Sequence, residues 1–182
     1  GANMLLVVEE ELTLIDTGHR GSAPEIVEFI RQLGRKPEEI SLIILTHNHI
    51  DHVGGLAELK QMTQARVAIH KTDIGERKNL PSAKAEDIDI RLAGGEVFDL
   101  LGGLEIIHTP GHTPGSISLF SSQNKLLIVG DAVRKRRDNL DLPFRTSSFD
   151  LTQAVDSIRK MSRLNLDILC FGHGLPLTGD VK

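Results

Sequence analysis

Residues 46–55 read Thr-His-Asn-His-Ile-Asp-His-Val-Gly-Gly, and the apolar run 41–45 before them has the character of a buried strand. Four metal-binding side chains, His47, His49, Asp51 and His52, fall within six positions. Alternate residues of an extended segment point the same way. We therefore expect His47, His49 and Asp51 to project together, while His52 turns into the next helix. This ligand set is typical of zinc and predicts a site for two cations.

Composition limits the classes of protein that remain. The chain has 182 residues, 40% of them hydrophobic, which is enough for one globular domain over residues 1–182. The formal charge of −4 gives no overall attraction for nucleic acid or an anionic membrane, and no apolar run is long enough to span one. A single cysteine, Cys170, excludes an intramolecular disulfide and fits a cytoplasmic setting. Tyrosine and tryptophan are absent.

Hydrophobic periodicity predicts alternating strands and helices. We expect strands at 4–8, 12–16, 41–45, 67–69, 96–100, 104–107, 117–120, 126–129 and 168–171. A helix is expected from a capping box of Ser22 and Glu25 to about Leu33, where Gly34 ends it. A second is expected at 54–62, a third after Asp150 as N-cap, and a helix and loop within 71–93.

Three later strands repeat the pattern of an apolar run that ends in a possible ligand. Strand 104–107 leads to His108 and His112, strand 126–129 leads to Asp131, and strand 168–171 leads to His173. Glycine or proline flanks each of these positions, which allows sharp turns close to an ion. The carboxyl ends of strands are also where open α/β sheets place their ligands.

These motifs resemble those of the metallo-β-lactamase-fold hydrolase superfamily in its glyoxalase-II-like form. The matching pieces are Asp16-Thr17-Gly18, residues 46–52, residues 109–115, Gly130-Asp131 and Gly172-His173-Gly174. The resemblance implies an α/β (α+β) fold, a four-layer αββα sandwich with a dinuclear metal site. It implies that His47, His49 and His112 hold the first ion, that Asp51, His52 and His173 hold the second, and that Asp131 bridges both. Zinc is the expected metal, and iron or manganese also suits these ligands.

The resemblance implies a hydrolase of small thioesters, esters or lactones. A water that bridges two cations loses a proton near neutral pH and becomes the nucleophile. Asp51 is expected to accept a hydrogen bond from that nucleophile, and Asp16 to orient ligand imidazoles from behind. The alternatives are β-lactam hydrolysis, phosphodiester hydrolysis helped by the basic run 134–137, a mononuclear site, and a non-enzymatic metal-binding module. We expect a small molecule as the partner, and neither nucleic acid nor membrane.

Several residues have simpler interpretations. His19, His70 and His108 fall outside the ligand positions of the family, and a supporting role is expected for His108. Cys170 lies in an apolar strand, where inert burial is expected. The basic run 134–137 is expected to be a solvated loop.

Overall fold

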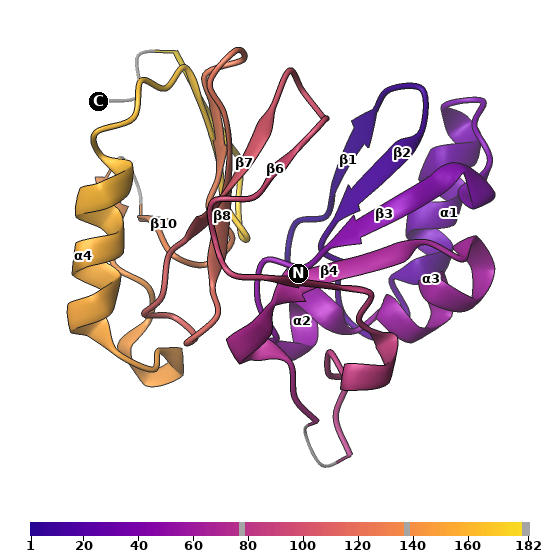
Figure 1. Ribbon diagram of the computed structural model, residues 1–182, viewed down its shortest axis with the longest axis horizontal. Coiled ribbons are helices and arrows are strands. Elements are labelled where there is room, and N and C mark those ends of the chain that lie inside the picture. The colour runs from indigo at the N-terminus through magenta and orange to yellow at the C-terminus, as the bar shows by residue number, and fades with distance from the viewer. Residues whose placement is uncertain (77–78, 137–138, 180–182) are drawn as a thin grey trace. The chain divides into compact units, whose positions relative to one another are not determined.

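The computed structural model describes residues 1–76, 79–136 and 139–179, and it divides into two compact units (Figure 1). The first unit comprises Gly1–Ile69 and Ile74–Arg91, and the second comprises His70–Asp73 and Leu92–Lys182. Each unit has its own sheet and its own apolar core. The prediction of one domain over residues 1–182 stays a prediction.

The first unit is built on a five-stranded sheet in the order β1-β2-β3-β4-β5. The strands are β1 (Leu5–Val8), β2 (Leu12–Ile15), β3 (Ile40–Ile44), β4 (Arg66–His70) and β5 (Ile90–Leu92). β1 and β2 form the expected antiparallel hairpin, and β2, β3 and β4 run parallel to one another. Their apolar sequences reflect this arrangement, because parallel strands in the middle of a sheet are covered on both faces.

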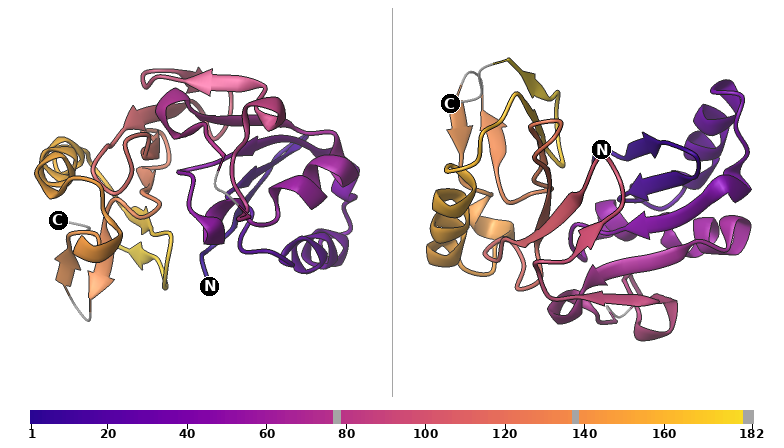
Figure 2. Two further views of the ribbon diagram at one scale, coloured as in Figure 1. Left: turned by 90° about the horizontal axis from the view of Figure 1, so that it is seen from below. Right: turned by 45° about the horizontal axis from the view of Figure 1, so that its top comes forward.

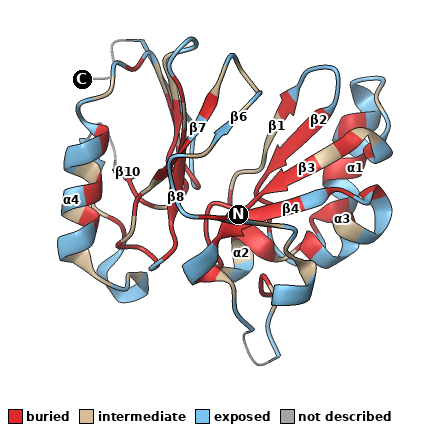
Figure 3. Ribbon diagram, in the orientation of Figure 1, coloured by how far each residue is buried: buried red, intermediate tan, exposed pale blue. Residues whose placement is uncertain are grey.

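Two helices cover one face of this sheet, α1 (Ala23–Gln32) and α3 (Leu56–Thr63) (Figure 1). Their apolar faces join the core: Ile26 and Ile30 of α1 and Leu56 and Leu59 of α3 belong to one cluster of buried side chains. Figure 3 shows that their outer faces are exposed. Amphipathic spacing therefore fixes which side of each helix meets the sheet.

The second unit is built on a six-stranded sheet in the order β13-β12-β9-β8-β7-β6. The strands are β6 (Val97–Phe98), β7 (Leu104–His108), β8 (Ile117–Ser121), β9 (Leu126–Ile128), β12 (Ile168–Cys170) and β13 (Leu177–Thr178). Helix α4 (Leu151–Met161) lies along one face of this sheet (Figure 2). Met161 at its end packs with Leu127, Leu169 and the fully buried Phe171.

Strand direction decides where the loops of the second unit emerge. β7 and β8 are antiparallel, β8 and β9 are antiparallel, and β9 and β12 are parallel. β7, β9 and β12 therefore run the same way, and their carboxyl ends lie at one edge of the sheet. The loops that carry His112, Asp131 and His173 all leave from that edge, as the sequence pattern indicated.

Four predictions about local structure need correction. Ser22 precedes α1, but its side chain makes no capping hydrogen bond and instead contacts Nδ1 of His19 at 3.2 Å. The helix expected at 54–62 is present as α3, but a separate short helix that was not expected, α2 (Ile50–Val53), precedes it. The described part of 71–93 contains short 3₁₀ turns at Lys71–Asp73 and Ala85–Asp87 and strand β5, and no α-helix.

The fourth correction concerns the basic run, which is the first half of a β-hairpin and not a plain loop. β10 (Arg134–Arg136) pairs antiparallel with β11 (Asn139–Asp141). Arg137 lies outside the described residues. Among the described residues, no helix is long and apolar enough to cross a membrane.

Candidate metal centre

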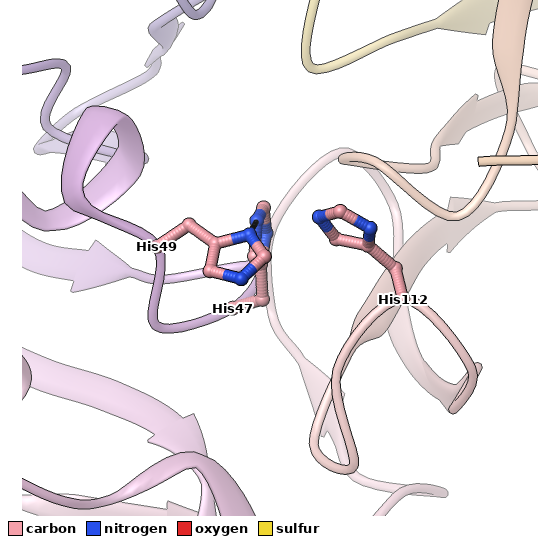
Figure 4. Close-up of side chains that lie close together, drawn as sticks. All are labelled: His47, His49 and His112. Atoms are coloured by element: carbon pink, nitrogen blue, oxygen red, sulfur yellow. Dashed lines mark hydrogen bonds between the residues drawn. The ribbon is translucent and has the colours of Figure 1, made fainter. Parts of the chain in front are cut away.

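The loop after β3 places His47 and His49 together. His47 is buried, and its Nε2 atom lies 3.0 Å from Nδ1 of His49 (Figure 4). Two nitrogens that bind one tetrahedral zinc ion at about 2.0 Å lie about 3.3 Å apart. The two nitrogens are thus separated by a distance that suits a shared ion.

Asp16 supports this loop from the end of β2. It is 2% exposed, and its Oδ1 accepts a hydrogen bond from the backbone N–H of Thr46 at 2.7 Å. Its Oδ2 accepts from the Thr46 hydroxyl at 2.7 Å and lies 2.7 Å from Nδ1 of His52. Asp16 has a positive φ of 60°, which aspartate tolerates better than most residues. One buried carboxylate therefore fixes both the start of the loop and the ring of His52.

The expectation that Asp51 continues the extended segment is wrong. His49 has extended backbone, but α2 begins at the next residue, so that Asp51 and His52 lie in a helical turn. The helix turns the fully buried His52 toward Asp16 and leaves Asp51 half-buried. Oδ2 of Asp51 lies 3.9 Å from Nε2 of His52, so the two donor groups still face a common region.

In the second unit, Asp131 stands beside two histidines. The backbone N–H of Gly172 donates to the carbonyl of Gly130 at 2.6 Å, which joins the loops after β9 and β12. Oδ2 of Asp131 lies 3.4 Å from Nε2 of His173 and 3.4 Å from Nε2 of His112. Both distances match the spacing of neighbouring ligands on one ion, and the same carboxylate oxygen makes both contacts.

His112 lies on the loop after β7, and its ring is drawn in Figure 4. Its Nδ1 lies 3.3 Å from the hydroxyl oxygen of Ser148, and that hydroxyl donates to the carbonyl of Phe144 at 2.7 Å. With its proton committed to Phe144, the Ser148 oxygen accepts from His112. Sequence reasoning did not find Ser148.

Three histidines thus have tautomers that can be assigned from their partners. Nδ1 of His52 donates to Asp16, and Nδ1 of His112 donates to Ser148. Nδ1 of His47 donates to the Thr46 hydroxyl at 3.0 Å, because that hydroxyl gives its own proton to Asp16. In each ring Nε2 is then the nitrogen with the lone pair, which is the form that binds a metal.

Asn48 has a structural task. Its amide Nδ2 donates to the carbonyl of Gly75 at 3.1 Å, and its Oδ1 accepts from the backbone N–H of Ala83 at 2.9 Å. The side chain between the two histidines therefore ties the loop to Gly75 and Ala83 of its own unit.

The other residues considered from the sequence have structural surroundings. The rings of His70 and His108 stack with their centroids 4.0 Å apart, and Nε2 of His108 donates to the carbonyl of Pro114 at 2.9 Å. Burial lowers the pKa of His70, and the neighbouring His108 lowers it further. Burial raises the pKa of the Cys170 thiol, which keeps this half-buried cysteine protonated and unreactive. His19 is exposed.

The basic hairpin contributes one residue to the surroundings of Asp131. Arg134 donates to the carbonyl of Leu142 at 2.7 Å and to Oδ2 of Asp141 at 2.6 Å, and its guanidinium lies 4.2 Å from the ring centroid of Phe144. Its charge is thus neutralised within the hairpin. The exposed Lys135 and Arg136 are the other described residues of the basic run.

Comparisons with known proteins define the family. Residues 1–173 match the metallo-beta-lactamase superfamily. The chain is 30% identical over 201 residues to the probable metallo-hydrolase YflN of Bacillus subtilis (strain 168), covering 91% of this chain and 76% of that protein. It is 26% identical over 207 residues to an N-acyl homoserine lactonase of Bacillus thuringiensis, covering 94% of this chain and 80% of the lactonase.

Solved structures point to the same family as the sequence comparisons. MEM-A1, a subclass B3 metallo-beta-lactamase isolated from a soil metagenome library, superimposes with a TM-score of 0.74 at 29% identity, covering 95% of this chain and 74% of that one. The chain therefore belongs to the metallo-β-lactamase superfamily and is a hydrolase of that superfamily. The predicted fold class is confirmed. The histidine and aspartate groups are of the kind that holds divalent metals in this superfamily.

Proposed function

We propose that the chain is a dinuclear metal-dependent hydrolase of small thioesters, esters or lactones. In this proposal the first ion is held by His47, His49 and His112. The second is held by Asp51, His52 and His173. Asp131 is shared between the two ions, and zinc is the metal expected from this donor set.

One observation carries the proposal. Each of three histidines, His47, His52 and His112, has its Nδ1 on a protein oxygen that accepts its proton. A histidine with a structural role can also have a fixed donor, as His108 does at Nε2, but the three proposed ligands share the same nitrogen as donor. Three rings with the same nitrogen held from behind are the arrangement by which proteins orient imidazole ligands.

The donor set also fits the charge of two divalent ions. The five proposed imidazoles are neutral as ligands, and Asp51 and Asp131 bring two negative charges against four positive ones. The position of Asp131 suits a shared ligand, because its Oδ2 lies at equal distances from His112 and His173. A net positive charge remains to attract the oxygen of a carbonyl group.

Two divalent ions held by these donors would supply an activated water as nucleophile near neutral pH. The protein's own part is to fix the donors and to handle protons. Asp51 is half-buried, with one oxygen toward His52, and we assign it the task of accepting a hydrogen bond from the nucleophile. Asp16 holds the ring of His52 and the start of the loop, and so maintains the geometry of the donors.

Apolar groups beside the donors favour an uncharged acyl substrate. A pocket in the second unit is lined by Val133, Pro143 and Phe144 together with His112, Asp131 and His173. Phe144 is 61% exposed, so it offers an apolar surface to a substrate rather than to the core. The charge of Arg134 in the same wall is neutralised by Asp141, which weakens the case for an anionic phosphodiester.

β-Lactam hydrolysis is the second candidate, and the similarity to MEM-A1 favours it. A nucleophile able to open a lactone is also able to open a strained lactam. Phosphodiester hydrolysis has less support. Among the described residues of the basic run, only Lys135 and Arg136 are exposed and could meet an anionic substrate.

The test is a substrate panel with metal-free and zinc-reloaded protein. We expect zinc-dependent turnover of thioesters, esters or lactones at least about 100-fold above the metal-free protein, in line with the power of metal-activated water. The variant H47A should abolish it. Turnover of nitrocefin alone would favour the second candidate. The absence of zinc-dependent turnover on every acyl substrate would contradict the proposal.

A further inference from the structure

The loop that presents His112, residues 109–116, is fixed on one side by α4. Gly111 approaches the helix so closely that a Cβ atom there would lie 2.3 Å from the backbone nitrogen of Ala154. The backbone N–H of Phe149 donates to the carbonyl of His112 at 3.0 Å. These contacts fix the first half of the loop, and the second half has a different anchor.

That second anchor is Asp73, at the end of the 3₁₀ turn Lys71–Asp73. Its side chain is 6% exposed, and its two oxygens hold the two halves of one short segment. Oδ2 accepts a hydrogen bond from the Thr113 hydroxyl at 2.7 Å, and Oδ1 accepts from the backbone N–H of Gly115 at 2.6 Å. Asp73 is 40 positions from Thr113 and 42 positions from Gly115 in the sequence.

The fit between Asp73 and the loop is close. A Cβ atom at Gly115 would lie 2.6 Å from Oδ1 of Asp73 and 2.7 Å from its Cγ, so only glycine allows this approach. A buried carboxylate is costly unless it is hydrogen-bonded, and hydrogen bonds to a charged acceptor are about twice as strong as neutral ones. The conformation of the loop is therefore tied to this carboxylate.

We propose that Asp73 is a positioning residue for His112. The backbone of His112 lies between Gly111, which α4 holds, and Thr113, which Asp73 holds. Fixed from both sides, the residue keeps its ring between Ser148 at Nδ1 and Asp131 at Nε2. The inference rests on the proposed function for the role of His112, since it concerns how well that imidazole is placed to bind a metal.

Hydrogen exchange on the metal-free protein tests the anchor directly. In D73A, exchange of the Gly115 amide should quicken at least about tenfold, because its hydrogen-bond acceptor is gone. D73N should restore most of the protection, since asparagine keeps an oxygen for Gly115 and offers an amide to the Thr113 hydroxyl. The matched control is D156A, which removes an exposed carboxylate from α4 and should change nothing at Gly115.

Zinc affinity, measured by competition with a chelator, tests the consequence for His112. Removal of a supporting group behind a metal ligand typically costs 10–100-fold in affinity. D73A should show a loss in that range, D73N a near-normal affinity, and D156A the wild-type value. Should D73A fail to fold, T113V keeps the shape of the side chain but removes the hydroxyl's bond to Asp73, together with its 2.7 Å contact to the Ser116 hydroxyl, and a smaller loss is expected.

Wild-type exchange at Gly115 in D73A, or wild-type zinc affinity in D73A or in T113V, would overturn the inference. An equal loss in D73A and D73N would also overturn it, because asparagine keeps an acceptor for Gly115 and a partner for Thr113 and should therefore hold the loop. If the wild-type protein itself binds no zinc, the proposed function fails instead, and the exchange data still decide whether Asp73 holds the loop.

Discussion

Nδ1 of His52 lies 2.7 Å from Oδ2 of Asp16, and the two side chains are 0% and 3% exposed. The two residues are 36 positions apart and meet because β2 and β3 run parallel with their carboxyl ends at one edge. The contact fixes which nitrogen of His52 carries the proton, and Thr46 completes the set of donors around the carboxylate.

Replacing Asp16 tests this contact. D16N keeps the size of the side chain but loses the negative charge that fixes the His52 tautomer, so zinc affinity should fall about 10–100-fold. Chelator competition measures the affinity. D156N, at an exposed position of α4, is the control and should bind zinc normally. A D16N protein with wild-type zinc affinity would show that Asp16 serves the fold alone.

Ser148 and Ser147 offer a matched pair in one turn. Both hydroxyls lie near the carbonyl of Phe144, but the Ser148 oxygen alone contacts Nδ1 of His112. S148A should weaken zinc binding by about tenfold, the lower end of the effect expected for a group behind a ligand, because its contact of 3.3 Å is long. S147A should have no effect. Equal zinc affinities for the two variants would contradict the assigned tautomer of His112.

The stacked pair of His70 and His108 predicts a dependence of stability on pH. Burial, and then His108, lowers the pKa of His70 below its ordinary value of 6.5. The unfolded chain therefore binds a proton more readily than the folded chain as the pH falls through 6.5. The free energy of unfolding should decrease over that window and level off below the folded pKa.

Urea unfolding at about pH 7.5 and about pH 5.5 measures this difference in stability. H70Q should narrow the difference relative to wild type, because glutamine does not titrate. H19Q, at an exposed histidine, should leave it unchanged. An unaltered difference in H70Q would exclude His70 as a source of acid sensitivity.

Phe171 anchors the second unit beneath the loop of His173. It is 1% exposed and packs in the cluster that contains Met161 and Leu169. F171A should lower the free energy of unfolding by about 3–5 kcal/mol, as expected when a buried aromatic is deleted. F149A removes a side chain that is 65% exposed and should cost less than about 0.5 kcal/mol. Comparable costs in urea unfolding would contradict the assigned core.

The sequence was sufficient to predict most strands of the two larger sheets, though not β5 or β13, and the loops that carry the proposed ligands. Apolar runs identify the strands, and the residues just after β3, β7, β9 and β12 must then lie at strand ends. The predicted helix after Asp150 is also confirmed. The side chain of Asp150 caps it by accepting hydrogen bonds from the backbone N–H groups of Thr152 and Gln153.

Tertiary contacts account for what the sequence could not predict. Asp73 and Ser148 reach the His112 loop across 40 and 36 positions, and no local pattern marks such pairs. The hairpin of β10 and β11 is rich in charge and lacks the apolar alternation that identifies a strand. The capping box failed because the Ser22 hydroxyl meets His19 instead of the helix backbone.

Metal stoichiometry tests the central claim most directly. Metal-free protein, dialysed to equilibrium against a slight excess of zinc and then analysed for bound metal, should hold two ions per chain if all seven proposed donors take part. A value of zero would contradict the metal centre altogether, and a value of one would contradict the dinuclear site with Asp131 as its shared ligand.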